Sequence, residues 1–361
     1  MTLKSVEIMH FRNLEFVKAQ PVTKGLNFIY GCNGSGKTSF LEAIYYLSLA
    51  RSFRSSIADR IVGHNAEKLA IFGQIQHAQD EPTIPLGVER HVGGELKLKV
   101  HGQFVQSVAE LAAYMPVQLI NSHCHDLLED GPILRRKYLD WGIFYLNTEF
   151  LRVWRLFYKA LKQRNAALKA LVSKSELESW TRELINTSSQ IDQLRRDYVA
   201  QLIPLMTAMM VELYPFTGLK VDYQSGWDTA FSYEEYLGRQ LEKDRFLGYT
   251  QSGPHKADLK ITINNIPAKD ILSRGQQKLF VCAMILARGA LLQSRVNKLP
   301  IYLVDDLPSE LDVTNRFSLI ALLSKQETQI FVTAVDNTCC EDFSLCSPVK
   351  MFHVEHGKVT G

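Results

Sequence analysis

The sequence predicts an α/β fold in which two strand-containing segments, one near each end of the chain, build a nucleotide-binding lobe around a mixed sheet. The glycine-rich loop Gly31–Thr38 lies between a short apolar strand and a helix, and the apolar run Ile301–Val304 ends on two acids. Between these ends, the stretch from about Pro132 to Lys243 is rich in helix-forming residues. We therefore expect a head with an N-terminal antiparallel β part and an inserted helical lobe.

The composition is typical of a globular protein, with 361 residues, 46% of them hydrophobic and 22% charged. No run in the sequence approaches the roughly 18 apolar residues that cross a bilayer. The charged start, Met1–Glu7, lacks an apolar signal core. We therefore expect a cytoplasmic protein without a membrane partner. The net charge of +3 is too small to indicate nucleic-acid binding by itself.

The N-terminal segment has the pattern of strands around one helix. Alternation in Val6–Phe11 predicts a half-buried strand, and Leu26–Tyr30 predicts a short buried strand that runs into the glycine-rich loop. Thr38–Ser48 follows with helical spacing. Three more strands are expected to pair antiparallel, with a turn at Gly93-Gly94, and these are Ile71–Gln76, Ile84–Arg90 and Leu96–Val100.

The middle of the chain changes to a helical pattern. Arg135–Ser173 is almost free of glycine and proline, and Leu177–Leu213 continues with amphipathic spacing, although Pro204 should kink or break it. Tyr233–Lys243 is another helical stretch, and strand patterns return at Leu259–Ile263 and Phe331–Thr333. The expected domains are the N-terminal half of the nucleotide-binding lobe at 1–130, the helical lobe at 131–247 and the C-terminal half at 248–361.

The loop Gly31–Thr38 fits the pattern G-x-x-x-x-G-K-T, which cradles the phosphates of ATP with backbone N–H groups and a helix N-terminus. Lys37 is expected to bridge the β- and γ-phosphates, Thr38 to ligate Mg²⁺, and Asn33 to reach the γ-phosphate side. A chance match is the alternative, and the strand before and the helix after the loop argue against it. The residues assigned to ATP are Gly31, Cys32, Asn33, Gly34, Ser35, Gly36, Lys37 and Thr38.

Two acids, Asp305 and Asp306, follow the apolar run Ile301–Val304. Asp305 is expected to bind the Mg²⁺ ion. Asp306 occupies the position of an acid that orients the attacking water, and because aspartate is shorter than the more usual glutamate, we expect slow hydrolysis. The alternative is that Asp306 only supports metal binding.

The segment Leu272–Gln277 (LSRGQQ) opens the apolar helical run Leu279–Leu292. Ser273 is well placed as a helix N-cap, and capping alone is one interpretation. The other interpretation is the L-S-x-G-Q signature of ABC-type ATPases, in which this helix end faces the γ-phosphate held by a second subunit. Together with the phosphate loop and the acidic strand, the signature indicates an ABC-type ATPase head that closes over ATP as a homodimer. The expected contacts are Ser273, Gly275 and Gln276.

Several assignments stay open. Arg12 could reach the nucleotide phosphates or be a surface residue. Gln118 and Asn121 are alternatives for the residue that links the γ-phosphate to the inserted lobe. Asp312 is a candidate for the loop that crosses between the two sites of a dimer, and Thr333 stands where ABC transporters place a switch histidine, which also favours slow turnover.

The sequence resembles the RecF family of bacterial recombination mediator ATPases, which is related to the heads of structural-maintenance-of-chromosomes (SMC) proteins. The resemblance covers the whole chain and includes the phosphate loop with its helix, SGPHKADL from Ser252, the signature segment and DDLPSELD from Asp305. GPILRRKYLDW, which begins at Gly131, and LKQRNAALK, which begins at Leu161, are not general ATPase motifs. These two motifs narrow the resemblance to this family.

The resemblance implies a weak DNA-dependent ATPase that dimerises on ATP and binds duplex DNA near single-strand gaps or junctions. It also implies action with RecO and RecR to load RecA in gap repair, replication restart and the SOS response. An alternative is a non-catalytic scaffold that ATP switches and that recruits partners to junctions. The charge of the basic stretch Phe150–Ser173 alone favours a solvated helix face, but with the resemblance this stretch becomes a candidate DNA surface. The DNA-binding candidates are Lys159, Lys162, Arg164 and Lys169, followed by Arg51 and Arg54.

Overall fold

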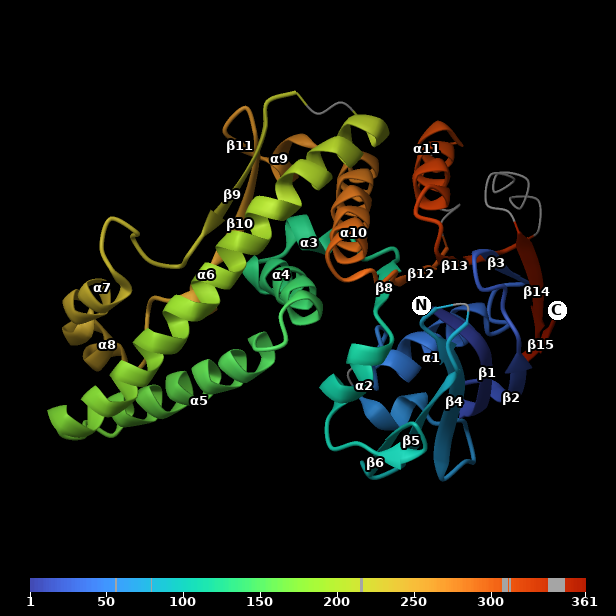
Figure 1. Cartoon of the computed structure of the whole chain (residues 1–361), viewed down its shortest axis with the longest axis horizontal. Coiled ribbons are helices and arrows are strands. Elements are labelled where there is room, and N and C mark those ends of the chain that lie inside the picture. Colours follow the sequence, from blue (N-terminus) through green and yellow to red (C-terminus); the bar gives the residue numbers. More distant parts are fainter. Residues whose placement is uncertain (56, 79, 215–216, 307–310, 312, 337–347) are drawn as a thin grey trace. The chain divides into compact units, whose positions relative to one another are not determined.

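In the computed structural model, the described residues are 1–55, 57–78, 80–214, 217–306, 311, 313–336 and 348–361. They divide into two compact units, of which the first contains 1–124, 212–214 and 278–361 and the second contains 125–211 and 215–277 (Figure 1). This division differs from the boundaries expected from the sequence. Residues 248–277, which we placed with the C-terminal half of the head, cluster with the helical unit.

The first unit contains two sheets in the part of the chain that the structure describes. An antiparallel sheet has the strand order β2-β1-β4-β5-β6-β7, and a mixed sheet has the order β15-β14-β3-β13-β12-β8. The antiparallel strands are β1 (Thr2–Phe11), β2 (Leu14–Ala19), β4 (Lys68–Gln76), β5 (Ile84–His91), β6 (Leu96–Val100) and β7 (Gln103–Phe104). The mixed sheet contains β3 (Gly25–Tyr30), β8 (Val117–Ile120), β12 (Ile301–Val304), β13 (Gln329–Ala334), β14 (Val349–Glu355) and β15 (Lys358–Thr360).

Helix α1 (Lys37–Leu49) fills the core between these two sheets. Its side chains belong to one hydrophobic cluster with residues of both sheets, and nine of its residues are buried. A helix that is buried on all sides carries no amphipathic stripe, which explains its continuous apolar sequence. Gly73 of β4 permits the close approach, because a Cβ there would lie 2.4 Å from Leu47 Cδ2. The first unit also includes α2 (Val108–Tyr114), α11 (Val313–Ser324) and a 3₁₀ turn at Ala58–Ile61.

The order of the mixed sheet gathers the sequence motifs of the first unit at one edge. Strands β3, β13 and β12 are neighbours and run parallel, so that Phe28 pairs with Val332 and Val332 pairs with Val304. Parallel strands present their carboxyl ends at the same edge, where open α/β sheets bind ligands. The phosphate loop follows β3, and Asp305 follows β12 directly. Residues more than 260 positions apart in the sequence therefore meet.

The second unit is helical, with one small antiparallel sheet. Helix α5 packs along α6 through an apolar cluster that contains Val153, Phe157 and Leu161 from α5 with Leu184 and Ile191 from α6 (Figure 1). The helices are α3 (Asp126–Glu129), α4 (Pro132–Leu146), α5 (Phe150–Lys169), α6 (Lys174–Leu213), α7 (Tyr233–Arg239), α8 (Leu241–Leu247) and α9 (Ala268–Ile271), with a 3₁₀ turn at Pro254–Lys256. The strands are β9 (Leu219–Gln224), β10 (Asp258–Ile263) and β11 (Ile266–Pro267).

Two sequence expectations need correction. Helix α6 continues through Pro204 as one element of 40 residues, so the expected break does not occur there. Helix α10 (Arg274–Val296) is long and apolar enough to cross a membrane by length and composition, whereas we expected no such run. Of its apolar window, 67% is buried inside the structure. A mostly buried core helix passes the same test, so this helix is weak evidence for a membrane span.

Candidate functional site

The phosphate loop closes around the start of α1. Gly36 is the residue before the helix, with φ of 119°, and no side chain caps this end. The first N–H groups of α1 are therefore available to an anion, as in phosphate-binding loops. Gly31 has φ of 153°, and a Cβ there would lie 2.1 Å from the carbonyl oxygen of Val354 in β14. The loop thus needs glycine at position 31 for contact with the neighbouring strand.

Lys37 is held by the loop itself. Its Nζ donates to the carbonyl oxygens of Gly31 (2.7 Å) and Cys32 (2.9 Å). Burial lowers the pKa of Lys37, and the nearby carboxylate of Asp306 partly offsets that effect. Lys37 also lines the same cavity as Gly36 and Thr38 at the start of α1, where a phosphate requires positive charge.

A chain of hydrogen bonds joins α1 to the ends of β12 and β13. Thr38 Oγ1 donates to Asp305 Oδ1 at 2.9 Å, and Thr333 Oγ1 donates to the same oxygen at 2.8 Å. The backbone N–H of Asp306 donates to Thr333 Oγ1 at 2.8 Å. Burial raises the pKa of Asp305, while the hydrogen bonds from Thr333 and Thr38 act in the opposite direction. This set of hydroxyl and carboxylate oxygens is of the kind that Mg²⁺ prefers.

Asp306 and Thr333 are placed by the backbone as well as by their side chains. Asp306 has φ of 54°, in the left-handed region that aspartate tolerates better than most residues. This conformation re-aims the chain directly after β12. Thr333 accepts the Asp306 N–H and donates to Asp305, so it fixes the spacing of the two acids.

The sequence did not identify Glu42, which organises the arginines of this site. Glu42 is fully buried, and Arg12 binds both its carboxylate oxygens, through Nε at 2.5 Å and through Nη2 at 2.8 Å. Arg54 Nη1 lies 3.7 Å from the same carboxylate, and Ser52 donates to it. A buried carboxylate is stable only when it is paired, so Glu42 holds these side chains together. Its position in a helix that is buried on all sides gave no sequence signal.

These groups surround a cavity of about 500 Å³ in the first unit. Of the residues that the sequence assigned to ATP, Arg12, Asn33, Gly34, Gly36, Lys37 and Thr38 line it, together with Asp305 and Asp306. Gly31, Cys32 and Ser35 are not among the lining residues, and of these Gly31 and Ser35 are buried while Cys32 is exposed. Residues that the sequence did not identify also line the cavity, namely Asn13, Ser39, Ser122 and Val335.

The candidates for the residue that links the γ-phosphate to the helical lobe are Gln118 and Asn121, and both have other partners. Gln118 is buried, and its Oε1 accepts from Arg288 Nε (3.1 Å) and Nη2 (2.9 Å). Asn121 Oδ1 accepts the backbone N–H of His123 at 3.2 Å. Ser122, the residue after Asn121, lines the cavity, and neither candidate does. Asp312 lies outside the described residues.

The signature segment lies in the second unit and begins α10. Ser273 is exposed, and its Oγ accepts the Gln276 N–H (3.4 Å) while Gln276 Oε1 accepts the Ser273 N–H (3.0 Å). These reciprocal bonds form a capping box. Gln277 is buried and donates to the carbonyl oxygens of Lys269 and Leu272, both at 3.2 Å. Gly275 allows open access, because a Cβ there would meet no atom within 4 Å.

The basic residues of α5 separate into two groups. Lys159, Lys162 and Lys169 are exposed, and with Arg152 and Arg155 they follow a spacing of three, four or seven residues along one helix face. Arg164 has no exposed surface. It donates to Asp244 Oδ2 at 2.9 Å and to Thr250 Oγ1 at 2.6 Å. The expectation that Arg164 contacts DNA is therefore wrong, because a buried and paired guanidinium cannot reach a phosphate.

The two arginines near the phosphate loop are exposed. Arg51 Nη2 donates to the Tyr45 hydroxyl at 3.4 Å, while Arg54 lines the cavity described above. Arg54 therefore belongs to the same cavity as the phosphate loop, whereas Arg51, three residues earlier, is not among the residues that line it.

Comparison with known proteins places these features in a family. The family described as the RecF/RecN/SMC N terminal domain matches residues 2–360. The chain is 42% identical over 360 residues to the DNA replication and repair protein RecF of Shewanella piezotolerans, covering 100% of this chain and 99% of the relative. The same protein of Shewanella frigidimarina is also 42% identical, with the same coverage.

Solved structures agree with this placement. One described as the recombination mediator protein RecF-ATPrS in the RecFOR pathway has a TM-score of 0.86 and 27% identity, covering 99% of this chain and 97% of that chain. The Smc head domain of Pyrococcus furiosus has a TM-score of 0.59 at 14% identity, covering 99% and 96% of the two chains, which shows a shared fold alone. The expected α/β head of the ABC type is therefore confirmed.

Proposed function

The chain belongs to the RecF family, within the wider group of RecF, RecN and SMC N-terminal domains, and from this premise we propose that it is an ATP-dependent DNA clamp of recombinational repair. The chain of hydrogen bonds from Thr38 through Asp305 and Thr333 to Asp306, beside Lys37, carries the proposal. Such an arrangement binds a nucleoside triphosphate and orients a water against its γ-phosphate.

Each residue of the site has a distinct task in this reaction. Lys37 and the N-terminus of α1 bind the β- and γ-phosphates, and Thr38 and Asp305 hold the magnesium ion, which neutralises the phosphate oxygens. Asp306 orients the attacking water and receives its proton. Arg12 and Arg54, which Glu42 positions, stabilise charge on the phosphates. The short Asp306 side chain and Thr333 at the position of a switch histidine favour slow turnover to ADP and phosphate.

ATP closes two copies of the chain by engaging the signature segment of one against the phosphate loop of the other. The capping box of Ser273 leaves the helix N-terminus of α10 ordered and exposed, which suits a second anion contact. Gly275 and Gln276 complete the contact. In this arrangement hydrolysis opens the dimer and resets the clamp.

The molar mass in solution with Mg²⁺–ATP, with and without a gapped duplex, tests this mechanism. The wild type should double its mass with ATP, and Ser273→Arg should bind ATP yet remain monomeric. Ser232→Arg is a matched control, since Ser232 closes a capping box of the same kind on α7. If the wild type stays monomeric on DNA, or if both variants dimerise, Ser273 is only a helix cap and the ATP-closed clamp must be abandoned.

Duplex DNA near single-strand gaps or junctions is the proposed nucleic-acid partner. The exposed lysines of α5, which are Lys159, Lys162 and Lys169, support this, with the exposed Arg51 as a further contact. Replacing the three lysines by glutamate should weaken binding uniformly across sequences. It should also reduce the slope of log affinity against log salt by about 0.9 per lost phosphate contact. An unchanged salt slope would place the DNA elsewhere.

The wider role proposed for the chain is cytoplasmic and follows the family. It acts with RecO and RecR to help load RecA during gap repair, replication restart and the SOS response. The related solved structure is of a recombination mediator protein in the RecFOR pathway. Binding of purified RecR to the ATP-closed dimer, and not to Ser273→Arg, is the expected result.

A second candidate function is a scaffold that ATP switches without need for hydrolysis. Thr333 in place of a switch histidine favours it. Asp306→Asn distinguishes the two. The scaffold predicts that this variant still recruits RecR to gapped DNA and supports RecA loading, whereas the clamp predicts a trapped, inactive complex.

A further inference from the structure

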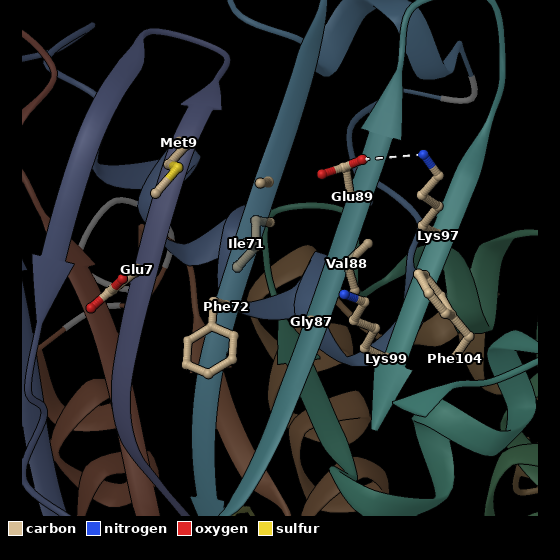
Figure 2. A pocket seen from close by; sticks show the side chains of 11 residues that line it. Glu7, Met9, Ile71, Phe72, Gly87, Val88, Glu89, Lys97, Lys99 and Phe104 are labelled. Carbon is tan, nitrogen blue, oxygen red and sulfur yellow. Dashed lines mark ion pairs between the residues drawn. The ribbon is translucent and has the colours of Figure 1, made fainter. Parts of the chain in front are cut away.

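The outer face of the antiparallel sheet carries a hollow that the ATP site does not use. The inner face of the sheet packs on α1, whereas the hollow on the outer face is lined by residues of β1, β4, β5, β6 and β7 (Figure 2). The hollow measures about 370 Å³ and is bordered by Met9, Ala70, Phe72, Gly87, Lys99 and Phe104. This size lies within the range of pockets that hold ligands, roughly 300–1,000 Å³.

The hollow lies above Gly87 of β5, the one glycine among the residues that line it. Gly87 of β5 pairs with Phe72 of β4 and with Lys99 of β6. A Cβ at Gly87 would meet only Lys99 Cβ at 3.6 Å and Phe72 Cδ2 at 4.0 Å, which are ordinary contacts. Neither packing nor backbone conformation therefore requires glycine at this position. Glycine within a strand weakens it and often marks a place where another chain or a ligand approaches closely.

Large apolar side chains around the hollow are exposed. Phe104 is 62% exposed, Phe72 41% and Met9 40%. Phe16, which pairs with Met9 across the first two strands, is 57% exposed. Exposed apolar side chains that gather in one patch commonly mark an interaction site, whereas scattered ones need no explanation.

The charges on this face favour an acidic partner. Glu7 is paired with Lys18 at 2.6 Å, and Glu89 is paired with Lys68 at 2.9 Å. Hydrogen bonds from Lys68 and His91 lower the pKa of Glu89 to about 2, so this carboxylate stays ionised and paired with side chains of the same sheet.

Lys97 also lies 3.7 Å from Glu89, on the rim of the hollow. Lys99 has no carboxylate within ion-pair distance among the described residues, and its Nζ lies 4.6 Å from the centre of the Phe104 ring. The rim therefore offers Lys99 for a carboxylate from outside, next to an apolar floor.

We propose that this hollow docks a segment of a protein partner that presents one large apolar side chain beside an acidic residue. The apolar side chain fills the space above Gly87, between Phe72 and Phe104, and the carboxylate pairs with Lys99. Duplex DNA fits this face less well, because binding to a backbone requires several phosphates to be neutralised together. The face offers one cation without a carboxylate partner among the described residues.

Fluorescence anisotropy with the full chain and labelled peptides tests the proposal. The probe is Gly-Asp-Asp-Phe-Asp-Gly, and its matched peptides carry alanine in place of phenylalanine or lysine in place of each aspartate. The phenylalanine peptide should bind at least about tenfold more tightly than either matched peptide. If the alanine peptide binds equally well, the hollow does not select an apolar side chain and the proposal fails.

Variants locate the binding on the sheet. Gly87→Val fills the hollow with a residue that strands favour, and it should lower the affinity for the phenylalanine peptide at least about tenfold. Lys99→Glu should do the same, whereas Lys24→Glu, at an exposed site outside the lining residues, is the matched control for charge. Phe104→Ala changes a largely exposed side chain, so it tests the site even if Gly87→Val does not fold.

Three other outcomes would overturn the proposal. If the wild type self-associates with rising concentration and Gly87→Val abolishes that, the occupant is a second copy of this chain. If Gly87→Val and Lys99→Glu lower the affinity for a labelled DNA duplex as much as the affinity for the peptide, the face is a nucleic-acid surface. Unchanged peptide affinity in Gly87→Val and Phe104→Ala would place the peptide elsewhere.

Discussion

Replacing Arg164 should destabilise the helical unit and should not act primarily through DNA. The side chains of Arg164 and Asp244 are both fully buried, and Arg164 also donates to Thr250 and Thr181. Arg164→Met would leave the Asp244 carboxylate buried, with the Gln251 N–H at 3.0 Å as a remaining donor. Breaking a buried pair in this way costs about 3–5 kcal/mol.

A loss of that size should lower the melting temperature of the unit by about 6–20 °C, at about 2–4 °C per kcal/mol for a unit of this size. Tryptophan fluorescence reports it cleanly, because all four tryptophans lie in the second unit, and these are Trp141, Trp154, Trp180 and Trp227.

Lys162→Met, on the exposed face of the same helix, is the matched control and should change stability by less than about 0.5 kcal/mol. The double variant Arg164→Met/Asp244→Leu should recover part of the loss, because it removes the stranded charge. The reasoning would be refuted if Arg164→Met had the same melting temperature as the wild type and yet lost affinity for DNA.

Three further predictions concern single residues. His255 Nε2 contacts the Thr250 carbonyl at 3.1 Å, and burial lowers the pKa of His255 from 6.5 to about 4. Stability should therefore be full above pH 6.5 and fall by up to roughly 3 kcal/mol towards pH 4, and His255→Asn should flatten this part of a fluorescence-monitored unfolding curve. Glu42→Gln removes the charge that holds Arg12, so affinity for a fluorescent ATP analogue should fall about tenfold with little change in the fold. Gly31→Ala should abolish nucleotide binding because its Cβ would lie 2.1 Å from a carbonyl oxygen, whereas Gly34→Ala should still bind nucleotide measurably, because a Cβ there would meet no atom within 4 Å.

Each of these has a result that would contradict it. An unaltered pH profile in His255→Asn would assign the pH dependence to other groups. Unchanged nucleotide affinity in Glu42→Gln, with a lower melting temperature, would make Glu42 a purely structural residue. Equal binding by the variants at Gly31 and Gly34 would mean that β14 yields to the added methyl group.

Part of the site could be predicted from the sequence because it depends on local conformation. The phosphate loop needs glycines at fixed intervals between a strand and a helix, and the capping box at Ser273 needs only residues three apart. The burial of Arg164 could also have been predicted from its position in the sequence. It falls three residues after Leu161 and four before Leu168, on the apolar stripe of α5, and only its charge suggested a surface role.

The sequence by itself determined the chemistry of the loop, the acids after β12 and the signature, since each is carried by neighbouring residues. The tertiary structure decided which side chains meet. It joined Thr38 to Asp305, paired Arg12 with Glu42 and opened a hollow above Gly87. Burial and pairing depend on the packing of segments far apart in the chain, and that packing sets whether a charged group is stabilised inside the fold or exposed to a partner.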